Sequence, residues 1–108
     1  MQNSEIIATK VHGWEIINHG GLIYKGKGRP HRDNLFDPEN NVDQAIAALE
    51  AWKVSGEFQR DWDLSSGFCR LQEFRPHEYD LDIRSTNKSL SAAIVEALVQ
   101  ATKEQLGD

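Results

Sequence analysis

Hydrophobic residues recur along this chain with a period that changes from segment to segment, and these changes predict alternating helices and strands. In residues 4–14, Ile7, Val11 and Trp14 follow the helical spacing of i, i+4 and i+7. Gly13 is expected to end this helix, because glycine tolerates the left-handed backbone of a helix C-terminus. The first predicted element is therefore a short amphipathic helix.

A hairpin and a long irregular stretch are predicted next. Residues 15–18 and 22–25 are short apolar runs, and the Asn-His-Gly-Gly sequence that joins them is typical of a tight turn. Residues 26–40 contain two glycines, two prolines and several Asn and Asp residues, which indicates a loop. Leu35 and Phe36 lie inside this loop, and we expect them to attach it to the core.

The clearest helix is predicted between Asn41, its N-cap, and Gly56, its end. Gln44 stands three residues after the cap, a position from which its side chain can reach back to it. The apolar residues of this segment follow helical spacing: Val42, Ala45, Ile46, Leu49 and Trp52.

A three-strand meander is predicted after this helix. Alternation over 58–64 places Phe58, Trp62 and Leu64 on one face and the acids on the other. Residues 68–74 form a second, less regular run. In the third, residues 79–84, the apolar residues alternate with charged ones, and we expect them to form one buried face: Tyr79, Leu81 and Ile83.

A last helix, capped by Ser89 or Ser91 and ending before Gly107, completes the chain. Its apolar stripe is Leu90, Ile94, Ala97, Leu98 and Ala101. The order of elements predicts one α+β domain over residues 1–108, in which three helices pack with a small antiparallel sheet (a hairpin plus a three-strand meander) in a layered α/β/α-like sandwich.

Composition agrees with a globular protein. The 108 residues are 39% hydrophobic and 27% charged, with a formal net charge of −5. The acidic balance argues against a general nucleic-acid binder. A single cysteine, Cys69, excludes an intramolecular disulfide and favours a reducing compartment. Because neither a signal peptide nor a membrane span is expected, the cytoplasm is the predicted location of a soluble chain.

Positive charge is concentrated in residues 25–32, where four cations and no acid occur: Lys25, Lys27, Arg29 and Arg32. Two glycines in this segment allow backbone N–H groups to approach an anion, and arginine offers a fork that matches phosphate oxygens. The spacing is not that of a phosphate-binding P-loop. A solvated loop, or one that pairs with acids of the same or a neighbouring subunit, is the alternative. Tyr24 beside it is the most plausible aromatic to stack on a ligand, and His31 lies within it.

The remaining reactive residues predict neither a catalytic nor a metal site, and no cofactor is expected. Four histidines are scattered without metal-ligand spacing: His12, His19, His31 and His77. Cys69 lies in a strand and is expected to be a small buried residue. The pairs Asp61/Asp63 and Asp80/Asp82 share strand faces, where solvated acids are the usual arrangement.

Three motifs, in the same order along the chain, resemble the phage ABA sandwich domain family. The run Ala8-Thr9-Lys10-Val11-His12-Gly13-Trp14 resembles an A-x-K-V-x-G-W opening, and Phe36-Asp37-Pro38 precedes a helix with Ala45 and Glu50. The third motif is the spacing of Ser89-Leu90, Ala93-Ile94, Ala97-Leu98 and Ala101. The resemblance implies a phage or prophage origin and a layered fold, and it supplies no catalytic residues. The chain departs from the family at His12, often a methionine there, and in its more basic segment 25–32.

Two functional hypotheses follow. The first is a non-enzymatic, oligomeric phage protein that sequesters a phosphorylated small molecule, such as a nucleotide signal of bacterial defence, through six residues: Tyr24, Lys25, Lys27, Arg29, His31 and Arg32. The second is a protein–protein interaction module that binds a host or phage partner. An enzyme that acts on phosphoesters is a third, weaker hypothesis.

Overall fold

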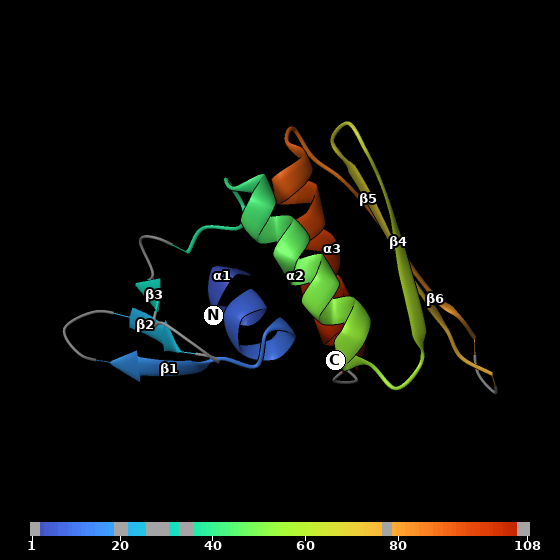
Figure 1. The fold of residues 1–108 in the computed structure, drawn as a ribbon. Coiled ribbons are helices and arrows are strands. Elements are labelled where there is room, and N and C mark those ends of the chain that lie inside the picture. The colour runs from blue at the N-terminus through green and yellow to red at the C-terminus, as the bar shows by residue number, and fades with distance from the viewer. Residues whose placement is uncertain (1–2, 19–21, 26–30, 33–35, 77–78, 106–108) are drawn as a thin grey trace.

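The structure is a computed structural model, and it describes residues 3–18, 22–25, 31–32, 36–76 and 79–105. Three helical segments and two antiparallel sheets follow one another along the chain (Figure 1). The helices are α1 (Asn3–Ile6), which continues into the π-helix η1 (Ile7–Val11), α2 (Val42–Ser55) and α3 (Leu90–Gln105). The strands are β1 (Glu15–Asn18), β2 (Leu22–Lys25), β3 (His31–Arg32), β4 (Gln59–Ser65), β5 (Phe68–Phe74) and β6 (Leu81–Thr86). The predicted α+β class is confirmed.

The first helix ends earlier than predicted. After one α-helical turn the backbone widens into η1, in which the N–H of His12 donates to the carbonyl of Ile7 at 3.0 Å. Gly13, at φ +74°, then turns the chain out of the helix, as expected for a glycine after a C-terminus. Trp14 therefore lies after the helix rather than on its last turn, and β1 begins at the next residue.

The predicted hairpin is confirmed, and a third strand joins it. Strand β2 pairs antiparallel with both β1 and β3. The prediction of irregular structure throughout residues 26–40 was wrong at His31–Arg32, which form β3. Phe36 is buried, as expected, whereas Leu35 lies outside the described residues. Local composition did not reveal β3 because a two-residue strand exists only through its partner.

Helix α2 has the predicted boundaries and the predicted cap. The side chain of Asn41 accepts a hydrogen bond from the backbone N–H of Gln44 at 3.1 Å. The side-chain Oε1 of Gln44 accepts a hydrogen bond from the N–H of Asp37 at 2.6 Å. This contact fastens the segment before α2 to the first turn of the helix.

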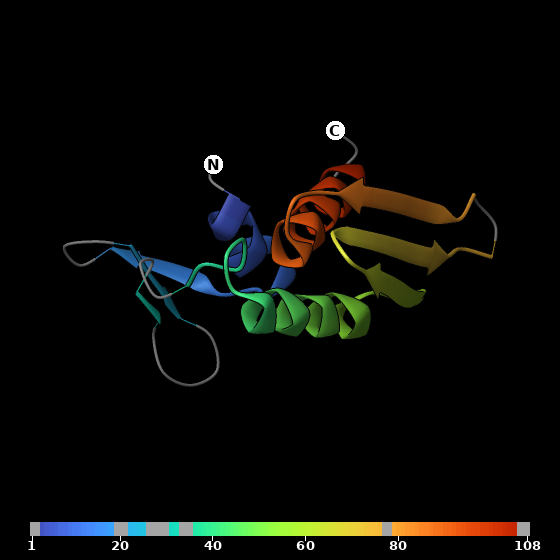
Figure 2. The same cartoon turned by 90° about the horizontal axis from the view of Figure 1, so that it is seen from above.

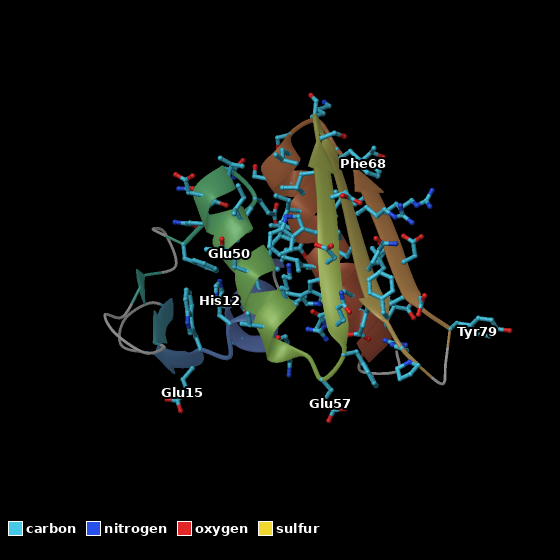
Figure 3. All side chains as sticks on the ribbon, turned by 45° about the vertical axis from the view of Figure 1, so that its right-hand side comes forward. His12, Glu15, Glu50, Glu57, Phe68 and Tyr79 are labelled. Atoms are coloured by element: carbon cyan, nitrogen blue, oxygen red, sulfur yellow. The ribbon has the colours of Figure 1, made fainter. Side chains whose placement is uncertain are left out.

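The meander β4–β5–β6 is confirmed, with a register that sorts its side chains into an inner and an outer face. One inner row joins Trp62, Leu71 and Ile83, which are all partly or fully buried. The expectation that Tyr79 belongs to this face was wrong. Strand β6 begins only at Leu81, and the Tyr79 side chain is 97% exposed. Figure 3 shows it pointing away from the sheet.

The helices form two layers on the same side of the β4–β6 sheet. Helices α2 and α3 lie side by side on its inner face, and η1 packs on both of them from the far side (Figures 1 and 2). Because α3 is enclosed between the sheet and η1, its apolar surface is wider than the predicted stripe and includes three further buried residues, Ala93, Val95 and Val99. No described element covers the outer face of β4–β6.

Candidate functional site

The predicted ligand-binding residues belong to the β1–β3 sheet and to the connection between its last two strands. Tyr24 and Lys25 end β2, and His31 and Arg32 form β3. Lys27 and Arg29 lie in residues 26–30, outside the described residues. The two ends of the cationic segment are thus backbone-paired, and the segment closes a second hairpin.

The backbone register of this hairpin is specific. Tyr24 stands opposite His31, and Ile23 stands opposite Arg32. Neighbouring strands lie roughly 4.8 Å apart, so the two residues of each pair are neighbours in the sheet although they are seven and nine positions apart along the chain. On the other side of β2, Lys25 stands opposite Glu15, which is exposed. This acid beside the cationic segment was not considered from the sequence.

An aromatic cluster joins the helical layers to β1. The His12 ring stacks on Trp14 with centroids 4.2 Å apart and planes 10° apart. Phe36 meets the Trp14 ring edge-on at 5.0 Å. These rings fix the position at which β1 leaves the helical layer (Figure 3, His12 and Glu15). The interpretation of Trp14 as a packing residue agrees with this geometry, since it lies against the core.

A buried ionic network, missed from the sequence, lies on the inner face of the other sheet. Arg60 and Glu73 are 4% and 3% exposed, and Nε of Arg60 donates to Oε2 of Glu73 at 2.6 Å. Arg60 also donates to the carbonyl of Trp52 at 2.6 Å, and its guanidinium lies 4.7 Å from the Trp52 ring centroid. The other Glu73 oxygen accepts from Arg75 at 2.6 Å. The network joins α2 to β4 and β5.

Opposing effects act on the Glu73 carboxyl. Burial by itself would raise its pKa, but the hydrogen bonds from Arg60 and Arg75 outweigh burial, and the pKa lies below its usual value. Glu73 is therefore a buried anion with both oxygens occupied. Together with Gly56 and two further acids, Glu57 and Glu104, the network lines a surface recess in which positive and negative groups are mixed. This arrangement fits a structural role for the pair.

The alternation of strand residues is the signal that could have revealed this network. Arg60 shares its face with Trp62 and Leu64, and Glu73 shares its face with Cys69 and Leu71. A cation and an anion at inward positions of adjacent strands predict a buried pair.

The carboxylates of the outer face are held by cations and backbone groups. Arg70 donates two hydrogen bonds to Asp82, at 3.0 and 2.9 Å, which lowers the pKa of that carboxyl. Asp80 accepts from the backbone N–H of Arg75 at 3.0 Å. Asp61 lies 3.8 Å from Nζ of Lys53. Asp61 and Asp82 thus belong to an exposed, charged face, as interpreted, whereas Asp80 lies before β6, which begins only at Leu81.

Cys69 is fully buried, and burial raises the pKa of its thiol to about 12. The prediction of a small buried residue at this position is confirmed. Among the described residues, His, Cys, Asp and Glu side chains form no group of three that could hold a metal ion. His19 and His77 lie outside the described residues.

Within the described part of the chain, every helix is too short or too polar to cross a membrane. Comparison with protein-family models, curated proteins and solved structures gives no match to this chain.

Proposed function

We propose that this chain is a non-enzymatic module that binds a phosphorylated, nucleotide-like small molecule at the β2–β3 hairpin. The observation that supports the proposal is the register of this hairpin. Tyr24 stands opposite His31 in the backbone ladder, and the cationic segment with Lys27 and Arg29 closes the hairpin between them. Such a site offers cations and backbone N–H groups to phosphates and an aromatic residue to a base.

A phage or prophage origin, and with it the sequestration of a defence signal, is the more specific form of the proposal. It rests on the resemblance of the three sequence motifs to the phage ABA sandwich domain family. The binding chemistry does not depend on it, because any phosphorylated ligand of suitable size would use the same groups.

A thermal-shift screen with cyclic nucleotides and ADP-ribose derivatives tests the proposal. A ligand that binds only the folded chain stabilises it by about 2.7 kcal/mol at a concentration of about 100 times its Kd. We expect one ligand class to shift the melting temperature of the wild-type chain and to lose this effect in Lys27→Glu/Arg29→Glu. Absence of a shift with every phosphorylated ligand contradicts the proposal.

A matched variant separates the effect of the cationic segment on ligand binding from the effect of net charge. Lys10→Glu/Lys88→Glu changes the net charge by the same amount, and both lysines are exposed and lie outside the hairpin. This control is expected to retain the ligand-induced shift. If both double variants lose the shift equally, binding depends on the general electrostatic field rather than on the hairpin.

A protein-binding module is the second candidate, and the end of the meander sheet favours it. Three large hydrophobic side chains are exposed where β4 begins and β5 ends: Phe58 at 39%, Phe74 at 41% and Tyr79 at 97%. Exposed aromatic residues are enriched at protein interfaces. A partner captured stoichiometrically by wild type should be lost with Phe74→Ser/Tyr79→Ser and retained with Lys27→Glu/Arg29→Glu. The opposite pattern excludes this candidate.

A further inference from the structure

Strand β6 is a free edge whose charges alternate in sign. Among the described residues β6 pairs only with β5, so its other side presents unpaired backbone groups. Asp82 and Arg84 lie on the outer face, where the Arg84 side chain is 62% and the Asp82 side chain 37% exposed. Ile83 between them faces the core and is 7% exposed.

From this pattern we propose that β6 pairs antiparallel with β6 of a second copy and forms a symmetric dimer with a continuous six-stranded sheet. The proposal is independent of the ligand site on the β2–β3 hairpin.

Strand geometry limits the possible registers. Along an edge strand, every second residue directs its backbone N–H and C=O away from the sheet. When two identical edges pair antiparallel, these residues must stand opposite each other, so the two residues of every facing pair are both even-numbered or both odd-numbered. This condition also keeps inner side chains beside inner ones and outer beside outer. The central registers that remain have their two-fold axis at Asp82, at Ile83 or at Arg84.

Charge selects one of these registers. With the axis at Ile83, Asp82 of each copy stands opposite Arg84 of the other, and the two Ile83 residues meet on the inner face. An axis at Asp82 or at Arg84 instead places two like charges directly opposite each other, which is unfavourable. The β6 edge is therefore complementary to itself in a single central register.

The other free edge of the sheet, β4, lacks this property. Its outer face carries Asp61 and Asp63 as its charged residues, so every central self-pairing brings acid against acid. Pairing β4 with β6 of another copy is heterologous, and in the register that joins Asp61 to Arg84 it also brings Asp63 against Asp82. A heterologous pair of this kind leaves a free edge at each end and does not close.

Helix α3 is compatible with the same symmetry. It lies over β5 and β6, so a second copy placed edge to edge brings its own α3 alongside. The groove between β6 and α3 is lined by Gln100 near its centre, by Glu96 and Lys103 to one side and by Glu104 to the other, all of them exposed. Antiparallel helices related by an axis near Gln100 bring both Lys103 and Glu104 of one copy toward Glu96 of the other, so the choice of register rests on the charges of β6.

Analytical ultracentrifugation of the full chain over a concentration series tests the proposal. Wild type is expected to dimerise, and Arg84→Asp, which places acid against acid at both outer positions, should weaken the dimer by roughly tenfold or more. Asp82→Arg should do the same by placing arginine against arginine. A wild-type chain that stays monomeric, or a dimer unaffected by Arg84→Asp, overturns the proposal.

Rescue provides the stricter test. The double variant Asp82→Arg/Arg84→Asp restores opposite charges in the proposed register and is expected to dimerise again. An equimolar mixture of the two single variants should form a heterodimer, although neither forms a homodimer at the same concentration. Circular dichroism confirms that each variant is folded, and Asp61→Asn on the β4 edge is a charge-changing control that should leave the dimer intact. Failure of both rescues, with all variants folded, overturns the register.

Discussion

Arg60 and Glu73 lie opposite each other on β4 and β5, on the face of the sheet that packs against the helices, and their side chains are 2% and 4% exposed. A hydrogen bond of 2.6 Å joins them. Ions so deeply buried are stable only when every charged group finds a partner. Trp52, Ser55 and Arg75 supply the remaining contacts, so the two buried charges are satisfied by five residues from three elements and the segment that follows β5.

Glu73→Gln is expected to lower the free energy of unfolding by about 3 kcal/mol, because removal of one partner leaves Arg60 as an uncompensated buried charge. Urea denaturation followed by tryptophan fluorescence measures this change. Asp82→Asn is the matched control. It removes a carboxylate from a partly exposed pair with Arg70 and should cost less than about 1 kcal/mol. Equal losses in the two variants would contradict a special role for the buried pair.

Stability should also depend on pH through Glu73. Its pKa is lower in the folded chain than in the unfolded chain, where a glutamate titrates near pH 4.3. A lowered pKa stabilises the folded state at pH values above the unfolded pKa, and this contribution is lost as pH falls through the folded pKa. The unfolding free energy of wild type should therefore fall more steeply below about pH 4.3 than that of Glu73→Gln. Parallel curves for the two proteins would contradict the prediction.

Gly56 is predicted to be required for close packing rather than for its backbone angles. It ends α2 with φ −90°, which any residue adopts, but an added Cβ would overlap the guanidinium of Arg60. The guanidinium cannot move away easily, since Glu73 and Trp52 hold it. Gly56→Ala should cost about 1–3 kcal/mol in the free energy of unfolding, measured by urea denaturation.

A double-mutant cycle isolates this contact. In an Arg60→Lys background, which lacks the guanidinium, the cost of Gly56→Ala should shrink. Gly13→Ala is the control: Gly13 has φ +74° and nothing within 4 Å of an added Cβ, so its cost of about 1 kcal/mol comes from the backbone alone. That cost should be the same in both backgrounds. A Gly56→Ala penalty unchanged by Arg60→Lys would show that the guanidinium is not the obstacle.

Cys69 is expected to resist thiol reagents while the chain is folded. Burial holds its thiol in the protonated form well above pH 8, and the reactive species is the thiolate. Labelling with a chromogenic disulfide at pH 8 should proceed slowly in native buffer and rapidly in denaturant. Ser65→Cys, at an exposed position at the end of β4, should react with one additional equivalent at once. Rapid native labelling of wild type would contradict the burial of Cys69.

Much of the fold follows from local patterns. The cap at Asn41, the end of α2 at Gly56 and the strands around the turn at Gly67 each rest on residues close together in sequence. Periodicity identifies such elements because a side chain's face depends only on its position in its own helix or strand. The wide apolar surface of α3 was predicted only in part, because the number of neighbours around a helix is not a local property.

Other features depend on partners that are distant in sequence. Strand β3 exists because Tyr24 and Ile23 pair with it, and Tyr79 leaves the sheet although its alternation with Leu81 favours a buried strand. The position of a strand end is set by its neighbour, since backbone hydrogen bonds require two strands.

The features of the candidate sites also fall into those that the sequence determines and those that depend on the tertiary structure. By itself, the sequence determined the cationic segment, the single buried thiol and the sign of each charge on the strands, because these depend on residue type and alternation. Only the tertiary structure decided that Arg60 contacts Glu73 and that Tyr24 pairs with His31 through the backbone. It alone also placed Asp82 and Arg84 on a free edge of the sheet. Each of these relations joins residues across strands, and strand order and register come from packing of the whole chain rather than from any one segment.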